Sequence, residues 1–182
     1  RGLGYWSRKE EAKELSEICN KRGFYTAFLS GEDSISKREE VVERLENGEL
    51  DYIFTVDIFN EGIDIPSVNQ IIMLRNTQSS IIFIQQLGRG LRKHGSKDYV
   101  TIIDFIGNYK NNYMIPMALS GDMSYNKDSL RKGTFDTSYI TGISSINFEA
   151  IAKERIYKAI DDVKLDSMKS IKDAYAKLKI RL

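Results

Sequence analysis

This sequence of 182 residues lacks several features that mark secreted, membrane and metal-binding proteins. Its single cysteine, Cys19, excludes an internal disulfide bond and a metal site built from cysteines. No apolar run approaches the ~20 residues that cross a bilayer, and no signal peptide is recognisable. The formal net charge is only +1, so any contact with nucleic acid must come from local groups of cations. We expect a cytoplasmic protein without membrane contacts.

Signatures of self-contained nucleotide enzymes are absent as well. The sequence has no G-x-x-x-x-G-K-[ST] phosphate loop and no acidic box of the D-E-x-H type. It also lacks a G-x-G-x-x-G motif after its first predicted strand, which argues against an independent α/β nucleotide enzyme. We therefore expect the isolated chain neither to bind ATP tightly nor to hydrolyse it.

The composition and the hydrophobic pattern indicate an ordinary globular domain with an appendage. Apolar residues make up 41% of the chain and charged residues 29%. Short apolar runs alternate with segments of helical periodicity. We predict strands at residues 2–6, 24–29, 51–56, 68–74 and 99–105. This pattern predicts an α/β fold, a parallel sheet with helices on both faces, whose ligands bind at the carboxyl ends of the strands.

Two helices of this domain have recognisable ends in the sequence. The tetrapeptide S-R-K-E, which begins at Ser7, fits a capping box with the serine as the cap, and Gly23 ends that helix. A second capping box, S-K-R-E, begins at Ser36, and its helix ends at Asn47-Gly48.

The pattern changes after Phe105. We predict, in order, a helix over 106–119 interrupted near Pro116, a polar loop over 121–142 with a strand near Phe135, and amphipathic helices over 148–163 and 168–178. Cations lie on the predicted outer faces of the last two helices. They could contact nucleic acid, but such residues more commonly form a solvent-exposed face. We divide the chain into a domain of residues 1–120 and a mainly helical accessory segment of residues 121–182. The start at Arg1, at the edge of a predicted strand, suggests a piece of a larger protein.

The clearest chemical signal is the stretch Q-Q-L-G-R-G-L-R-K at residues 85–93. Arg89 and Arg92 are three residues apart and project from the same face of a helix, where two guanidinium groups suit phosphate oxygens. Gly88 and Gly90 leave the backbone open to a bulky anion. The alternative is a helix whose basic end matches its dipole, but this does not explain two glycines that each cost about 1 kcal/mol in a helix. We interpret the stretch as a phosphate-binding surface.

The same stretch carries a family resemblance. Q-x-x-G-R-x-x-R at residues 85–92 resembles motif VI of the superfamily 2 helicases and translocases, and T-V-D-I-F-N-E-G-I-D-I-P at residues 55–66 resembles their motif V. The resemblance covers residues 2–119 and implies the second, RecA-like domain of a helicase motor. It implies that ATP and Mg2+ bind in a cleft between two domains. The amino-terminal RecA-like domain of the same polypeptide would hold most of the ATP and Mg2+, and it is the expected partner of this chain.

The resemblance also implies roles for individual residues of both motifs. Arg92 would be the principal arginine finger on the γ-phosphate, Arg89 would assist it or sense the nucleotide state, and Gln85 would help to position the site. ATP-binding roles would fall to Gly62 and Gly88, through close backbone approach, and to Asp64, through a hydrogen bond from the ribose. The alternative for Asp64 is a turn residue before Ile65-Pro66.

Five further residues stand where the family contacts the nucleic-acid backbone: Thr55, Ser7, Arg8, Ser30 and Gly31. Simple structural roles compete with this interpretation, because Ser7 can serve as a plain helix cap and Ser30-Gly31 as a plain turn. No residue is assigned to a metal.

In its details the sequence resembles bacterial restriction- and repair-type DNA helicases in which a phospholipase-D-like nuclease module precedes the motor. We therefore expect DNA as the substrate of an ATP-dependent motor, to which this chain supplies arginine fingers and a grip on the nucleic-acid backbone. Two alternatives remain. One is the corresponding half of an RNA helicase motor, because no RNA-specific stacking motif decides between the polymers. The other is a non-catalytic module that binds phosphates or nucleic acid.

Overall fold

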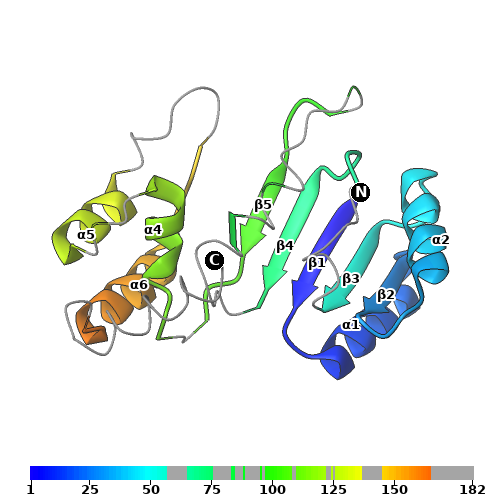
Figure 1. Ribbon diagram of the computed structural model, residues 1–182, viewed down its shortest axis with the longest axis horizontal. Helices are drawn as coiled ribbons and strands as arrows, with labels where there is room; N and C mark the ends of the chain where they lie inside the picture. Colours follow the sequence, from blue (N-terminus) through cyan, green and yellow to red (C-terminus); the bar gives the residue numbers. More distant parts are fainter. Residues whose placement is uncertain are drawn as a thin grey trace, which may run out of the picture. The chain divides into compact units, whose positions relative to one another are not determined.

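The computed structural model describes residues 1–56, 65–75, 83–84, 88, 95, 97–107, 110–121, 124, 126–136 and 145–164. The chain divides into two compact units, residues 1–76 with 81–105 and residues 77–80 with 106–182. The described part of the first unit contains a sheet flanked by helices α1 and α2, and the described part of the second unit contains helices α4, α5 and α6 (Figure 1).

The first unit is built on five parallel strands. These are β1 (Gly2–Trp6), β2 (Thr26–Ser30), β3 (Tyr52–Val56), β4 (Gln70–Leu74) and β5 (Thr101–Asp104). They lie in the order β2-β3-β1-β4-β5, and every neighbouring pair is parallel. This confirms the predicted parallel α/β fold, with strand ends within two residues of those expected. We call the side of the sheet where the strands end the carboxyl edge and the opposite side the amino edge.

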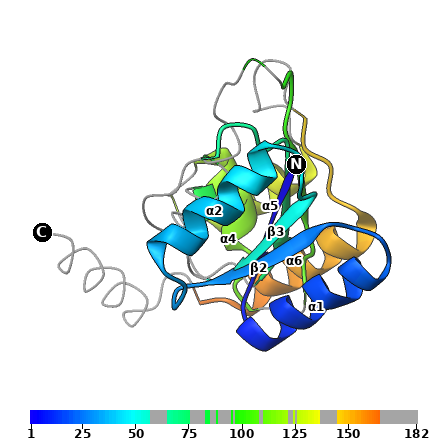
Figure 2. The same cartoon turned by 90° about the vertical axis from the view of Figure 1, so that its right-hand side faces the viewer.

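Helices α1 (Lys9–Lys21) and α2 (Ile35–Glu46) cover opposite faces of the sheet (Figure 2). The connection through α1 moves two places along the sheet, from β1 to β2, and the connection through α2 returns one place, to β3. Because such parallel crossovers are right-handed, connections that run in opposite directions place their helices on opposite faces. Helices on both faces were expected from the sequence.

On the α1 face, aromatic rings from β3 lie across β1. Gly2 and Gly4 pair in register with Tyr52 and Phe54. A Cβ atom would lie 2.1 Å from a Tyr52 ring carbon at Gly2 and 2.4 Å from a Phe54 ring carbon at Gly4. The two rings stack with centroids 6.1 Å apart, and Trp6 packs edge-on against Phe54 at 6.4 Å. The two glycines therefore make room for the aromatic side of the core.

Most of the fully buried side chains on the opposite face are aliphatic. Leu3 and Ile53 alternate with the glycines and rings of the α1 face, so they point the other way and are fully buried. The other fully buried aliphatic residues of the sheet include Leu29 and Ile71, and α2 buries Val41 and Leu45. Each such side chain contributes about 1.5–3 kcal/mol to stability.

Both predicted capping boxes of the first unit are wrong. The residue before α1 is Arg8, whose side chain makes no cap, and the Glu11 carboxylate instead accepts hydrogen bonds from Trp6 Nε1 (2.9 Å) and from Arg8 (3.2 Å). Helix α2 begins two residues earlier than predicted, because Ser34 Oγ accepts the Lys37 amide at 3.3 Å. Ser36 therefore lies inside the helix.

The predicted ends of these helices are confirmed. Helix α1 ends at Lys21 and is followed by Gly23 at φ +89°, and α2 ends at Glu46 before Gly48 at φ +80°. Both glycines occupy left-handed backbone conformations that other residues rarely adopt.

In the second unit, α4 (Met114–Ser120) contains Pro116 without interruption. The proline lies in the first turn, where its missing N–H has no partner in the helix, so the predicted break is wrong. This helix was predicted to belong to the first domain, whereas the compact units divide after Phe105. The division of the chain at residue 120 stays a prediction about domains.

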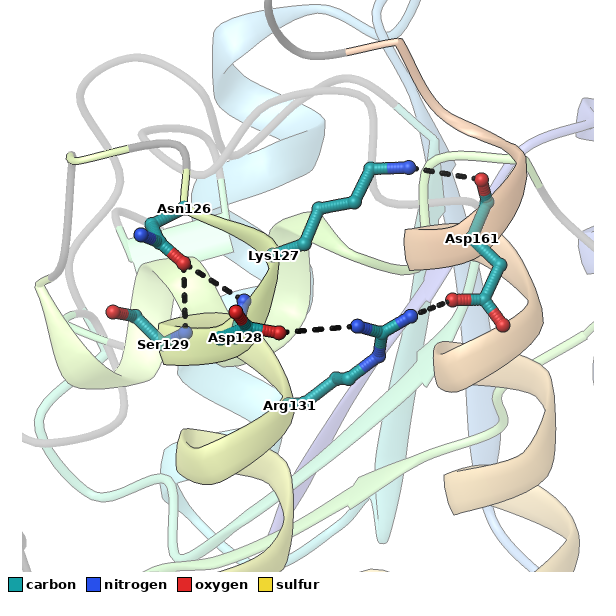
Figure 3. A network of polar contacts seen from close by, with 6 residues as sticks. All are labelled: Asn126, Lys127, Asp128, Ser129, Arg131 and Asp161. Carbon is teal, nitrogen blue, oxygen red and sulfur yellow. Dashed lines mark hydrogen bonds and ion pairs between the residues drawn. The ribbon is translucent and has the colours of Figure 1, made fainter.

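Helix α5 (Lys127–Phe135) occupies a segment predicted as loop and strand. Asn126 caps it, because Oδ1 accepts the amides of Asp128 (2.8 Å) and Ser129 (3.3 Å), as Figure 3 shows. Leu130 is buried and Thr134 Oγ1 donates to the Leu130 carbonyl at 2.9 Å. The predicted strand near Phe135 is therefore wrong.

Helix α6 (Ala150–Asp162) confirms the helix predicted over 148–163, and it packs against α5. The helix predicted over 168–178 lies outside the described residues. Across the part of the chain that the structure describes, no helix is both long and apolar enough to cross a membrane.

Candidate functional site

The carboxyl edge of the sheet brings together the residues predicted to contact nucleic acid. Ser7 and Arg8 follow β1, Ser30 ends β2 and Gly31 follows it, and Thr55 belongs to the carboxyl half of β3. These three strands are neighbours in the order β2-β3-β1. Ligands of parallel α/β sheets bind outside the carboxyl ends of the strands, so this edge is the candidate site.

Ser7 and Arg8 are exposed where β1 passes into α1. The Arg8 guanidinium lies 3.2 Å from the Glu11 carboxylate, one turn later. The next residue, Lys9, forms an ion pair with Glu32 at 2.5 Å, which links the start of α1 to the turn after β2. Because Ser7 does not cap the helix, its hydroxyl has no structural role of the kind proposed as the alternative.

The turn after β2 is held by its own side chains. Asp33 Oδ2 accepts the Ser30 amide at 2.6 Å, and Ser30 Oγ accepts the Glu32 amide at 3.3 Å. The Gly31 carbonyl accepts a hydrogen bond from Arg38 at 2.8 Å, whereas a Cβ at Gly31 would meet no atom within 4 Å. The plain turn is therefore present, and Gly31 is exposed in it. Contact between this turn and nucleic acid stays a prediction.

Asp33 is the anchor of that turn. Its carboxylate also forms an ion pair with Lys37 at 2.5 Å. Burial by itself would raise the pKa of Asp33, but the hydrogen bonds from Lys37 and from the Ser30 amide outweigh it and hold the pKa below its usual value. The carboxylate is therefore ionised at neutral pH and keeps the turn in place.

Thr55 does not reach the surface. Its side chain is fully buried between its register partners Tyr5 and Leu29, and Oγ1 has no hydrogen-bond partner. An unpaired buried hydroxyl costs about 1–3 kcal/mol. In this conformation the hydroxyl cannot contact a polynucleotide, and such a contact would require movement at the end of β3.

Asp104 is a candidate site residue that was not predicted from the sequence. It ends β5, pairs in register with Met73, and its Oδ2 is buried without a hydrogen-bond partner. Burial raises the pKa of Asp104 to about 6. Register places Thr55, Tyr5, Met73 and Asp104 in one row across four strands, on the same face of the sheet. The sequence did contain a signal for this residue, because a carboxylate at the end of the apolar run T-I-I-D-F indicates a buried acid.

Most residues of the two motif stretches lie outside the described residues. Five residues that are predicted to act on ATP lie outside the described residues, namely Gln85, Arg89, Arg92, Gly62 and Asp64. Gly88 is described and exposed, and a Cβ there would meet no atom within 4 Å, which leaves room for the predicted approach of a phosphate. Within the described ranges, no three histidine, cysteine or acidic side chains gather in a way that would hold a metal ion.

The second unit has a surface hollow of about 470 Å³ between α5 and α6, lined by Arg131, Lys132, Asp136, Tyr157 and Asp161. Arg131 lies between Asp128 and Asp161, with Asp128 Oδ1 at 3.2 Å (Figure 3). The hydrogen bond with Asp161 raises the pKa of Arg131 above its usual value. Because two carboxylates already neutralise this guanidinium, the hollow offers little net positive charge to a phosphate.

Comparison with known proteins gives a consistent match. A family model described as the helicase conserved C-terminal domain matches residues 3–94. The Saccharomyces cerevisiae protein named "Putative ATP-dependent helicase IRC3" is 31% identical over 81% of this chain and 20% of its own length. The ATP-dependent RNA helicase SrmB of Haemophilus influenzae is 32% identical over 50% of this chain and 21% of its own length.

Among solved structures, the yeast DEAD-box splicing factor Prp28 superposes with a TM-score of 0.63 over 92% of this chain and 33% of its own, at 16% identity. This likeness concerns the fold. The chain spans about a fifth of the length of the two curated relatives (20% and 21%).

Proposed function

Because the chain belongs to the family of helicase conserved C-terminal domains, we propose that it is the second RecA-like half of an ATP-dependent DNA helicase or translocase motor. One observation carries this proposal. The residues after β1 and β2 and the start of the motif V stretch at β3 converge on one edge of a parallel sheet. Such an edge can hold a polymer backbone on the same domain that carries the arginine motif.

In this proposal the chain contributes cations to phosphoryl transfer. Arg92 stabilises the charge on the equatorial oxygens of the γ-phosphate, with Arg89 and Gln85 in support. In related NTPases such an arginine increases kcat by about 10³- to 10⁵-fold. The amino-terminal domain of the same polypeptide holds most of the nucleotide and its Mg2+. An arginine donated across a cleft ties hydrolysis to the closure of the two domains.

The grip on nucleic acid falls to the carboxyl edge. Arg8 offers an exposed guanidinium and Gly31 an open backbone, and both suit phosphate oxygens. Contacts of this kind carry no sequence information and little distinction between DNA and RNA. Relatives named as RNA helicases and as DNA helicases both occur among the matches. DNA is proposed from the resemblance of the motif stretches to DNA-acting motors, and RNA is the alternative polymer.

ATP turnover by the full-length protein tests this proposal. We would measure wild type, Arg92→Ala and, as a matched control, Arg22→Ala, whose exposed side chain follows α1. Each would be measured with duplex DNA, single-stranded DNA, RNA or no polymer. We expect DNA to stimulate the wild type and the control alike. Arg92→Ala should bind ATP and lose about 10³-fold or more in turnover.

The other outcomes separate the alternatives. Stimulation by RNA alone would assign the chain to an RNA motor. Wild-type turnover by Arg92→Ala would contradict the arginine-finger assignment. If no polymer stimulates turnover, the chain is a phosphate-binding module without a motor role. Hydrolysis by the isolated 182-residue chain would contradict its assignment as half a motor.

A further inference from the structure

Three cations at the carboxyl edge are each paired with an acid. Arg8 lies 3.2 Å from Glu11, Lys9 lies 2.5 Å from Glu32, and Lys37 lies 2.5 Å from Asp33. Their residues belong to the start of α1, the turn after β2 and the start of α2. The pairs therefore stand directly beside Gly31 and the end of β1, where the proposed function places a phosphate backbone.

The pairs of Lys37 and Lys9 differ in how firmly their acids are held. The Asp33 side chain is only 16% exposed and also accepts the Ser30 amide, so it stays with Lys37. The Glu32 side chain is 79% exposed and has Lys9 as its side-chain partner. Water and salt screen an exposed pair of this kind, so a competing anion can take the place of the carboxylate.

We propose that Lys9 is a phosphate contact of the polynucleotide path and that Glu32 is its internal counter-ion, displaced when a phosphate arrives. The inference rests on the proposed function and adds to it a residue pair that sets affinity. A polymer has the advantage over a single anion, because its phosphates release condensed counter-ions when cations replace them. Gly31, adjacent to Glu32, leaves the space next to the pair open.

This arrangement has a measurable consequence. As long as Glu32 holds Lys9, part of the free energy of phosphate binding is spent on breaking the ion pair. Removal of the carboxylate should therefore tighten binding, whereas removal of the ammonium should weaken it. Since exposed pairs are weak, we expect changes of about two- to fivefold at low salt.

The test is polynucleotide binding by the full-length protein without nucleotide, read as fluorescence anisotropy of a labelled oligothymidine of about 20 nucleotides between about 50 and 200 mM salt. Variants are Glu32→Gln, Lys9→Gln and the double variant. The matched control is Glu49→Gln, because Glu49 forms an exposed ion pair with Arg44 at 3.3 Å just before β3, at the amino edge. Thermal unfolding of each variant verifies the fold.

We expect Glu32→Gln to bind about two- to fivefold more tightly and Lys9→Gln to bind more weakly by a similar factor. The salt slope of Lys9→Gln should fall by about 0.7, the contribution of one phosphate contact in a single strand. The double variant should behave like Lys9→Gln, because Glu32 acts through Lys9. Glu49→Gln should match the wild type.

Three results would overturn the inference. The first is a Glu32→Gln affinity equal to that of Glu49→Gln while the wild type binds. The second is tightening that persists in the double variant, which would mean that Glu32 repels phosphates directly. The third is a wild type that binds neither oligothymidine nor an RNA of the same length. That third result contradicts the proposed function itself and is thereby distinguishable from the other two.

Discussion

The amino and carboxyl edges of the same sheet differ in how their polar groups are paired. At the amino edge, the Arg1 carbonyl accepts the Asn69 amide at 3.0 Å, and Lys97 Nζ donates to the Val68 carbonyl at 2.8 Å. The start of β2 is held there as well, because Asp51 Oδ2 accepts the Tyr25 amide at 2.8 Å. Among the described residues of the amino edge, the buried Ser67 hydroxyl is an exception, because it has no hydrogen-bond partner.

The carboxyl edge retains a buried hydroxyl at Thr55 and a buried carboxylate oxygen at Asp104, both without partners. Buried polar groups are paired in the great majority of cases, and exceptions concentrate where a ligand or a second conformation uses them. Among the described residues, the carboxyl edge therefore leaves more of these buried polar atoms unpaired than the amino edge does, and we expect this to lower the stability of the fold there.

The largest expected effect is at Asp104. Its pKa is raised in the folded state, to about 6, so the folded protein binds a proton more readily than the unfolded chain. Stability from this group is present below the unfolded pKa near 4 and is lost as the pH rises through about 6, a change of about 2–3 kcal/mol.

Asp104→Asn should remove this pH dependence and raise the free energy of unfolding at pH 7. Urea unfolding at several pH values measures both, with the exposed Asp98→Asn as the control. An Asp104→Asn variant that keeps the wild-type pH dependence would contradict this account of the carboxyl edge.

A smaller effect, of opposite sign, is expected at the amino edge. Asn20 holds the first residue of β2, because its side chain accepts the Thr26 amide at 2.7 Å and donates to the Thr26 carbonyl at 3.0 Å. Asn20→Ala leaves these backbone groups unpaired and should destabilise the protein by about 2 kcal/mol. Thermal unfolding measures the change, with the exposed Asn47→Ala as the control. Unchanged stability would mean that the amino edge is not held by its polar pairs.

The smallest effect is expected at Thr55. Valine has nearly the same shape and lacks the unpaired hydroxyl, so Thr55→Val should stabilise the protein by about 1 kcal/mol. The same variant should lower polynucleotide-stimulated ATP turnover, if the hydroxyl is used when β3 moves. Calorimetry and turnover measure the two changes. Destabilisation by Thr55→Val would remove the distinction between the edges at this position.

Much of the fold was predictable, because its signals are local. Continuous apolar runs located all five strands, and Gly23 and Gly48 marked the helix ends. Helix starts were less predictable, since Ser34 and Ser36 are both good caps and the surrounding turn decides between them. Helix α5 was missed because its buried Leu130 depends on packing with the second unit's other helices, which overrides a Gly- and Ser-containing sequence.

The site divides in the same way. The carboxyl ends of parallel strands lie at the same edge of a sheet, so convergence of the Ser7–Arg8 and Ser30–Gly31 pairs on one edge follows from the motif positions. The burial of Thr55 and the unpaired oxygen of Asp104 depend on register and on neighbouring strands, which no local pattern encodes. The ion pair between Lys9 and Glu32 joins residues 23 positions apart and required the folded turn.

The rings that lie over Gly2 and Gly4 fix the position of β3 relative to β1. Tyr52 and Phe54 fill the space that side chains on β1 would take, so movement of β3 along β1 would break the packing of both rings over the two glycines. β3 leads into the motif V stretch and β1 leads into Ser7 and Arg8. We therefore expect β1 and β3 to move together, so that the segment after β3 and the segment after β1 shift as one unit.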